Sequence, residues 1–92
     1  MKLTTEQYNT LQDIAKKTKA DRWFCLKQNG DNEYFIYDLE NNMQLSWNIA
    51  LQWLNEAIIE EDGKLITKQE KEIFKNLWMS LEVYKWNINQ FQ

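Results

Sequence analysis

Carboxylates are the groups whose number and placement in this 92-residue chain could do chemistry. Eight of them fall between residues 28 and 63, a stretch without Lys or Arg and therefore with a net charge of −8. The segments on either side are basic, with net charges of +3 over residues 1–27 and +2 over residues 64–92. An acidic centre of this kind favours a basic partner and repels nucleic acid. Its acidic residues are Asp31, Glu33, Asp38, Glu40, Glu56, Glu60, Glu61 and Asp62.

These carboxylates carry no catalytic or metal-binding signature. The chain has no histidine, which removes the commonest general base and most nucleophile–base pairs. Its one cysteine, Cys25, cannot form an internal disulfide, and its two glycines lie too far apart for a phosphate loop. The run Glu60–Gly63 lacks the alternation and the distal Glu of a calcium loop. We therefore predict no enzymatic activity and no cofactor, and we interpret the acidic residues either as a binding face or as ordinary solvated surface.

Aromatic residues suggest a second surface. The chain has thirteen aromatic residues, five of them Trp, a residue type enriched in protein interfaces. We predict that Trp23, Tyr34 and Ile36 share one face of a sheet, which is either covered by a helix or part of an apolar partner-binding surface. With Arg22 and Lys27 the same face could stack the bases of single-stranded nucleic acid. The adjoining acidic stretch argues against that alternative.

The elements that must position these residues begin with a helix and a hairpin. Thr4 and Gln7 have the spacing of a capping box and predict a helix that starts there. Two strands follow, over residues 22–28 and 33–39, joined around an Asn-Gly dipeptide that is typical of hairpins. If Gln28 pairs with Glu33, the core face of the hairpin comprises Phe24, Leu26, Phe35, Tyr37 and Leu39. The opposite face then comprises Trp23, Cys25, Lys27, Tyr34, Ile36 and Asp38.

A strongly apolar helix follows the hairpin and a short third strand, predicted at Met43–Leu45. Ser46 is placed to cap this helix, which runs over residues 47–59. Its apolar arc spans about 200°, too wide for a surface helix, so we expect it to lie between two layers. A last helix, opened by a capping box at Thr67, is predicted over residues 68–91. It carries a second apolar stripe, which comprises Met79, Val83 and Trp86.

These elements predict a single α+β domain over residues 1–92. Their order is α-β-β-(β)-α-α, with a small antiparallel sheet packed on the central helix and a long C-terminal helix. The sequence shows no membrane-length apolar run and no signal peptide, so we expect a cytoplasmic protein.

The layout resembles that of the small acidic phage proteins that inhibit Cas9, the anti-CRISPR proteins. One branch of that family has a helix, three strands and two helices, with an acidic, Lys-poor segment in the strands and following loops. Here that segment is residues 31–42. The resemblance implies that acidic side chains such as Asp31, Glu33, Asp38, Glu40 and Glu56 occupy a basic groove meant for DNA. This chain is less acidic and richer in Trp than the family pattern.

The sequence therefore predicts a non-enzymatic protein-binding module with a basic protein partner, such as a phage or mobile-element inhibitor of a nucleic-acid-binding defence protein. The alternative is a homodimeric structural or accessory protein that associates through the stripe of the last helix. Single-stranded nucleic-acid binding is the less favoured third hypothesis.

Overall fold

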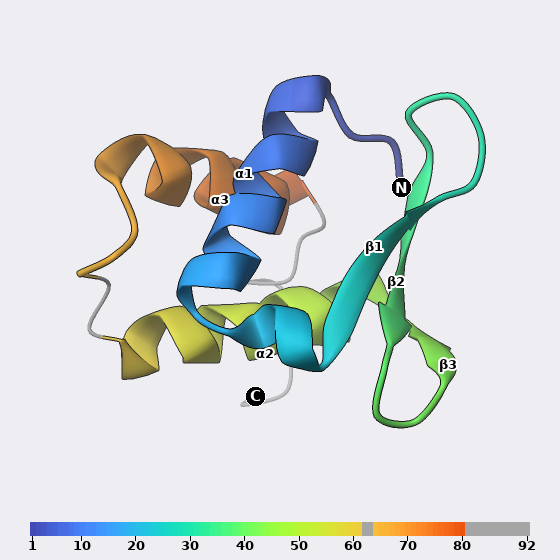
Figure 1. Ribbon diagram of the computed structural model, residues 1–92. Helices are drawn as coiled ribbons and strands as arrows, with labels where there is room; N and C mark the ends of the chain where they lie inside the picture. Colours follow the sequence, from blue (N-terminus) through green and yellow to red (C-terminus); the bar gives the residue numbers. More distant parts are fainter. Residues whose placement is uncertain (62–63, 81–92) are drawn as a thin grey trace, which may run out of the picture.

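The computed structural model describes residues 1–61 and 64–80. Within them the chain forms three α-helices and a three-stranded antiparallel sheet in the predicted order, so the α+β class is confirmed. The helices lie together on one side of the sheet (Figure 1). None of these helices is both long and apolar enough to cross a membrane. The elements are α1 (Thr5–Lys17), a 3-10 turn (Ala20–Arg22), β1 (Phe24–Gln28), β2 (Tyr34–Asp38), β3 (Met43–Leu45), α2 (Trp47–Glu60) and α3 (Lys68–Ser80).

The predicted helix starts are confirmed by hydrogen bonds to the first-turn backbone. Before α1, the Thr4 hydroxyl accepts from the backbone N–H of Gln7 at 3.1 Å, and the Gln7 side chain accepts from Thr4 N–H at 2.9 Å. Before α2, the Ser46 hydroxyl accepts from the N–H of Ile49 at 3.2 Å. These bonds satisfy donors that have no partner within the helix, and they fix where each helix begins.

The hairpin has a different register from the predicted one. Gln28 lies opposite Tyr34, not Glu33, so the predicted pairing is wrong by one residue. The difference arises in the connection between β1 and β2, where Gly30 has φ 118° and Asn32 has φ 57°. Gly and Asn adopt such positive φ values more readily than other residues do. Gly30 and Asn32 therefore allow a turn that differs in length by one residue from the turn predicted from the Asn-Gly dipeptide.

This shift turns β2 over. Side chains alternate between the two faces of a strand, so a one-residue change of register moves each side chain to the other face. Ile36 is 1% exposed and Asp38 is also buried, whereas Leu39 is 42% exposed. Phe35 and Tyr37 are half-buried and share the outer face of the sheet. The prediction that Ile36 belongs to an exposed partner-binding face is therefore wrong, because this side chain lies in the core.

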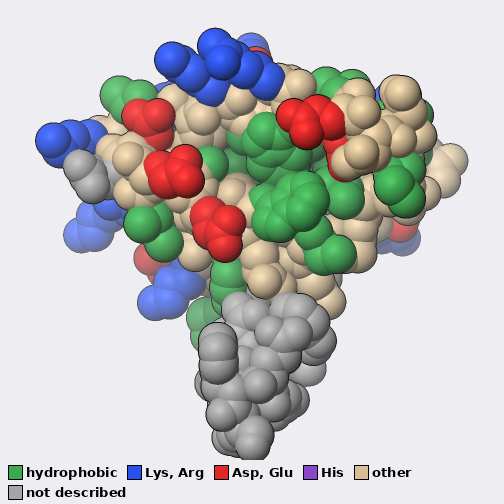
Figure 2. All heavy atoms as spheres, turned by 90° about the horizontal axis from the view of Figure 1, so that it is seen from below, with side chains coloured by type: hydrophobic (Ala, Val, Ile, Leu, Met, Phe, Trp, Pro, Cys, Tyr) green, Lys and Arg blue, Asp and Glu red, His purple; other side chains and the backbone are tan. Residues whose placement is uncertain are grey.

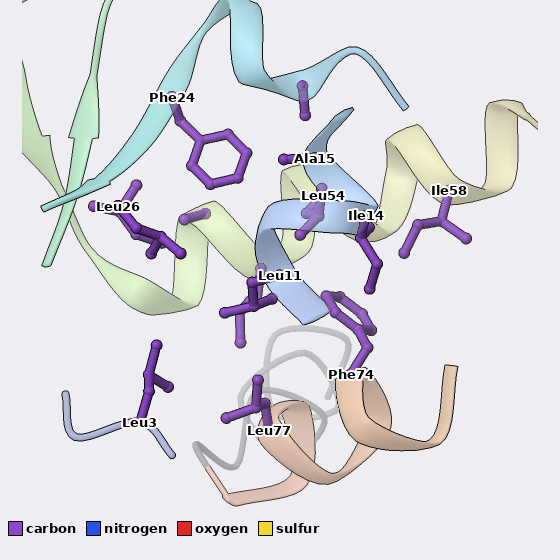
Figure 3. Packing of buried hydrophobic residues seen from close by; sticks show 14 of the residues in the cluster. Leu3, Leu11, Ile14, Ala15, Phe24, Leu26, Leu54, Ile58, Phe74 and Leu77 are labelled. Atoms are coloured by element: carbon purple, nitrogen blue, oxygen red, sulfur yellow. The ribbon is translucent and has the colours of Figure 1, made fainter. Parts of the chain in front are cut away.

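The core lies where α2 meets the sheet and the other two helices. Buried side chains from all these elements converge there, including Leu54 from α2, Ile14 from α1 and Leu77 from α3 (Figure 3). The buried face of α2 is the predicted one and comprises Ala50, Leu51, Leu54 and Ile58. Its flanks are not covered, because Ile49 and Trp53 are 40% and 43% exposed. The expectation that two layers enclose the whole apolar arc is therefore wrong at these two residues.

The described part of α3 confirms the predicted start of the last helix. The predicted remainder, with Val83 and Trp86, lies outside the described residues. At the start of α3 the backbone N–H of Glu70 donates to the Thr67 hydroxyl at 3.1 Å, and the Glu70 carboxylate accepts from Thr67 N–H at 2.9 Å. The same carboxylate oxygen accepts from Lys17 Nζ of α1 at 2.7 Å. Glu70 thus joins a helix cap to a half-buried ion pair between two helices.

Substitution of Glu70 is predicted to destabilise the fold in a pH-dependent way. Burial alone would raise the pKa of the Glu70 carboxyl, but the hydrogen bonds from Lys17 and Thr67 outweigh burial and hold the pKa below its ordinary value. A carboxyl group whose pKa is lowered in the folded state stabilises the protein at pH values above its ordinary pKa. This stabilisation is lost as the pH falls through the folded-state pKa. We expect Glu70→Ala to lower the free energy of unfolding by about 2 kcal/mol at neutral pH.

Urea denaturation at neutral and acidic pH measures this effect, and Glu72→Ala on the exposed side of α3 is the control. The control should change the unfolding free energy by less than about 0.5 kcal/mol. The difference between wild type and Glu70→Ala should shrink in acid. A difference that is the same at both pH values would contradict the assigned role of the charge.

The observed register predicts opposite results for two aliphatic residues of the hairpin. Ile36→Ala should lower the unfolding free energy by about 2–4 kcal/mol, because it leaves a cavity in the core. Leu39→Ala should cost less than about 1 kcal/mol, because Leu39 is 42% exposed and lies outside the core. Denaturant titration of both variants measures the two costs. Equal costs, or a larger cost at Leu39, would favour the other register.

Candidate functional site

A pocket of roughly 370 Å³ lies between α2, the β2–β3 turn and the residue that precedes β1. Figure 2 shows the face of the molecule formed by α2, where acidic side chains lie beside hydrophobic surface and basic side chains lie toward the edges. The volume is near the lower end of the range of small-ligand sites. The pocket is lined by Trp23, Asp38, Glu40, Asn41, Trp53, Glu56, Ala57 and Glu60. We call it the acidic tryptophan pocket.

One wall of the acidic tryptophan pocket is a single face of α2. Trp53, Glu56, Ala57 and Glu60 are spaced three and four residues apart, which brings them to the same side of a helix. Glu56 and Glu60 are exposed, and Trp53 is 43% exposed. Ala57 lies between these larger side chains and leaves space beside the indole. This wall therefore combines two solvated carboxylates with an open aromatic surface.

The two tryptophans that line the acidic tryptophan pocket are in contact with each other. The rings of Trp23 and Trp53 have centroids 5.5 Å apart and planes at 71°, an edge-to-face arrangement. Trp23 also packs on Phe24, with ring centroids 4.6 Å apart, and is partly buried against the core. The 3-10 turn before it brings the chain from α1 to β1 and sets the position of its ring. The core thus holds one indole in place and the second indole packs against it.

Asp38 and the β2–β3 turn form the opposite wall. One carboxylate oxygen of Asp38 accepts from the backbone N–H groups of Glu40 and Asn41 at 2.9 and 3.2 Å, and the other accepts from the Asn41 side-chain amide at 2.8 Å. The Asn41 amide, together with these backbone donors, holds the pKa of Asp38 below its ordinary value, against the opposing effect of burial. Asp38 therefore fixes the turn, and Glu40 is the carboxylate that the turn exposes.

The structure brings together only half of the predicted acidic surface. Asp38, Glu40, Glu56 and Glu60 line the acidic tryptophan pocket, but Asp38 is buried and its oxygens already accept hydrogen bonds. The other described acidic residues lie elsewhere. Asp31 is in the β1–β2 connection, Glu33 accepts from the Met1 amino group at 2.9 Å, Glu61 caps the C-terminus of α2, and Asp62 lies outside the described residues.

The predicted apolar surface is divided among several places. Ile36 is in the core, and Tyr34 stacks on Tyr8 of α1 with ring centroids 4.7 Å apart. Trp23 lines the acidic tryptophan pocket, and Lys27 is on the outer face of the sheet. The face proposed to stack nucleic-acid bases is therefore not formed by these residues. Met79 is 48% exposed on α3.

Sequence reasoning missed Trp53 as a site residue. Its helix was predicted to be covered on two sides, so every apolar residue of the arc was assigned to packing. The excess width of the apolar arc was the signal that could have identified Trp53. When such an arc is wider than the core can cover, some of its side chains stay at the surface. Asn41 and Ala57 carried no signal of their own, since their roles depend on the turn and on the neighbouring side chains.

A second pocket, of roughly 510 Å³, lies between α2 and α3 and is mainly apolar. Ile58, Phe74, Trp78 and Met79 supply its apolar lining. Asn55, Lys71 and Lys75 complete it. This groove differs in chemistry from the acidic tryptophan pocket, since its charged residues are both basic.

The acidic tryptophan pocket has the chemistry of cation binding. Its carboxylates attract a positive group, and the face of an indole attracts a cation through the charge distribution of the ring. Within the described part of the chain, no three His, Cys, Asp or Glu side chains are grouped so that they could hold a metal ion. The geometry suits an organic cation that is flat or extended enough to lie against an aromatic ring.

Comparison with known proteins gives no relative from which function could be transferred. The chain matches no protein-family model, no curated protein and no solved structure. The resemblance to the Cas9 inhibitors therefore remains a prediction based on element order and charge. Any function must be argued from the sites that the described residues form.

Proposed function

We propose that this protein is a non-enzymatic protein-binding module that binds a basic partner through the α2 face. One observation carries the proposal, namely that the acidic residues of α2 and the β2–β3 turn converge on one hollow that also exposes an indole. A merely solvated acidic surface would not need to leave Trp53 43% exposed beside the carboxylates. Carboxylates around an aromatic residue are a common way to bind a basic protein surface.

A narrower form of the proposal is an inhibitor of a nucleic-acid-binding protein, of phage or mobile-element origin. A protein that binds DNA presents a basic groove, and an acidic protein seated in that groove would exclude the phosphate backbone. The charge separation along the chain and the resemblance to the Cas9 inhibitors support this form. Of the acidic residues in residues 31–42, Glu40 is the one that both faces solvent and lines the acidic tryptophan pocket.

Reversal of the two exposed charges on α2 should weaken binding to a polybasic probe. We expect the wild type to bind nona-arginine more weakly as salt rises from about 50 to about 300 mM, because salt screens the charges. The double variant Glu56→Lys/Glu60→Lys should lose at least tenfold in affinity, measured by isothermal titration calorimetry. Asp38 is left intact, because its carboxylate holds the β2–β3 turn.

The matched control is Asp13→Lys/Glu72→Lys, which changes the net charge equally at exposed residues outside the acidic stretch. If the affinity for nona-arginine falls by the same factor in both double variants, net charge alone governs binding and the α2 face is not the site. The narrower form is tested with the same proteins. Wild type, but not Glu56→Lys/Glu60→Lys, should displace labelled DNA from guide-loaded Cas9. Undisturbed DNA binding would contradict the inhibitor form.

The apolar groove between α2 and α3 favours a second candidate function, a homodimeric structural or accessory protein. Met79 borders this groove and is 48% exposed, and Phe74 and Trp78 line it with ring centroids 6.0 Å apart. Aromatic residues and Met are enriched where two proteins meet. A second copy of the chain seated on the groove would cover these side chains.

If the protein is a dimer that associates through this groove, substitution of Met79 should lower its mass in solution. Wild type should sediment as a dimer, and Met79→Glu should sediment as a monomer, because a charge would replace an apolar contact in a desolvated interface. Asn76→Glu places the same charge at another exposed residue of α3 and should leave the dimer intact. Sedimentation velocity at several concentrations measures both. A monomeric wild type at every concentration would exclude this candidate.

A further inference from the structure

The acidic tryptophan pocket is specific in its geometry as well as in its charge. Its two indoles meet at 71°, and Ala57 is the smallest of the side chains that line the pocket with them. Because Trp23 is held against Phe24 and the core, the aromatic wall is already formed without a ligand. A preformed wall costs little to order upon binding.

The charges around this wall come from two separate elements. Glu56 and Glu60 stand one helical turn apart on α2, and Glu40 approaches from the β2–β3 turn. Among the described residues that line the pocket, none is a Lys or an Arg. A cation that enters the pocket would therefore meet carboxylates on two sides and no repelling charge on the wall.

These features select the chemistry of the occupant. An anion would be repelled, and a neutral aromatic group would leave the carboxylates without a partner. An ammonium group is a compact, strongly hydrated charge, whereas a guanidinium group is flat, weakly hydrated and able to stack on an indole while its edge donates to carboxylates. A flat cation thus satisfies the indole face and the flanking carboxylates at the same time.

We infer that the acidic tryptophan pocket receives the guanidinium group of an arginine side chain of the partner protein. The group stacks on the indole of Trp53, with Trp23 beside it, and Glu56, Glu60 and Glu40 accept its N–H groups. This inference rests on the proposed function, since it names the side chain by which the basic partner is recognised. It adds that recognition depends on a pocket of defined shape and not only on the summed charge of the α2 face.

The test uses short blocked peptides that contain a single arginine, lysine or citrulline and no other charge. Citrulline has nearly the shape of arginine but is neutral. Binding is followed in NMR titrations by the indole N–H signals of Trp23 and Trp53. We expect the arginine peptide to shift both signals, the lysine peptide to bind several times more weakly, and the citrulline peptide to leave the signals unchanged.

Two variants separate the pocket from the charge. Trp53→Leu removes the indole, and Ala57→Leu fills the space beside it, and neither changes the net charge. Each variant should bind the arginine peptide about five- to thirtyfold more weakly, which corresponds to the contribution of a desolvated cation on an aromatic face. Circular dichroism and the unshifted signals of residues in the core establish that each variant is folded.

The outcomes distinguish this inference from the proposed function. If both variants bind the arginine peptide and nona-arginine like wild type while Glu56→Lys/Glu60→Lys does not, the arginine pocket is refuted and the acidic binding face stands. Equal affinity for the arginine and lysine peptides would refute the guanidinium assignment. Tighter binding of tetramethylammonium than of the arginine peptide would refute it too, in favour of a quaternary amine. If nona-arginine does not bind wild type at all, both proposals fail.

Discussion

The pairing of β1 with β2 is the constraint on which the rest of the structure depends. A strand alternates its side chains between two faces, so the register decides which half of β2 joins the core. In the observed register Leu26 lies opposite Ile36, and Phe24 lies opposite Asp38. The Leu26–Ile36 pair closes the core against α2. On the same face of the sheet, the Phe24–Asp38 pair places a carboxylate at the edge of the core. The boundary between core and pocket is thus set by two successive pairs on one face of the ladder, with the Cys25–Tyr37 pair between them on the other face.

Asp38 connects that boundary to the site. It is 3% exposed, yet its carboxylate is satisfied by two backbone N–H groups and a side-chain amide of the following turn. A buried charge that is fully hydrogen-bonded in this way rigidifies its surroundings. The turn therefore holds Glu40 across from Glu56 and Glu60, and the geometry of a surface site depends on a side chain that no ligand needs to touch.

The sequence was sufficient to predict the elements, because their signals are local. Capping boxes at Thr4 and Thr67, the cap at Ser46 and the buried stripe of α2 each depend on residues within one or two turns. The register was not predictable in the same way. It depends on the positive φ values of Gly30 and Asn32, which decide between turns of different length, and both faces of β2 carry apolar residues. The acidic tryptophan pocket was less predictable still. The wide apolar arc of α2 indicated that some side chain would stay uncovered but not which one, and the spacing of Trp23, Glu40 and Glu56 along the chain says nothing of their proximity.

The pocket is assembled from three segments that are distant in sequence: the residue before β1, the β2–β3 turn and the second half of α2. Such a site does not exist in the unfolded chain, so a ligand that occupies it binds the native state alone. Occupancy then raises the free energy of unfolding by RT ln(1 + [L]/Kd), about 2.7 kcal/mol when the free ligand is a hundred times its dissociation constant. The melting temperature of the protein consequently reports on the pocket, and a thermal-shift screen of cationic compounds becomes a direct way to search for what this protein binds.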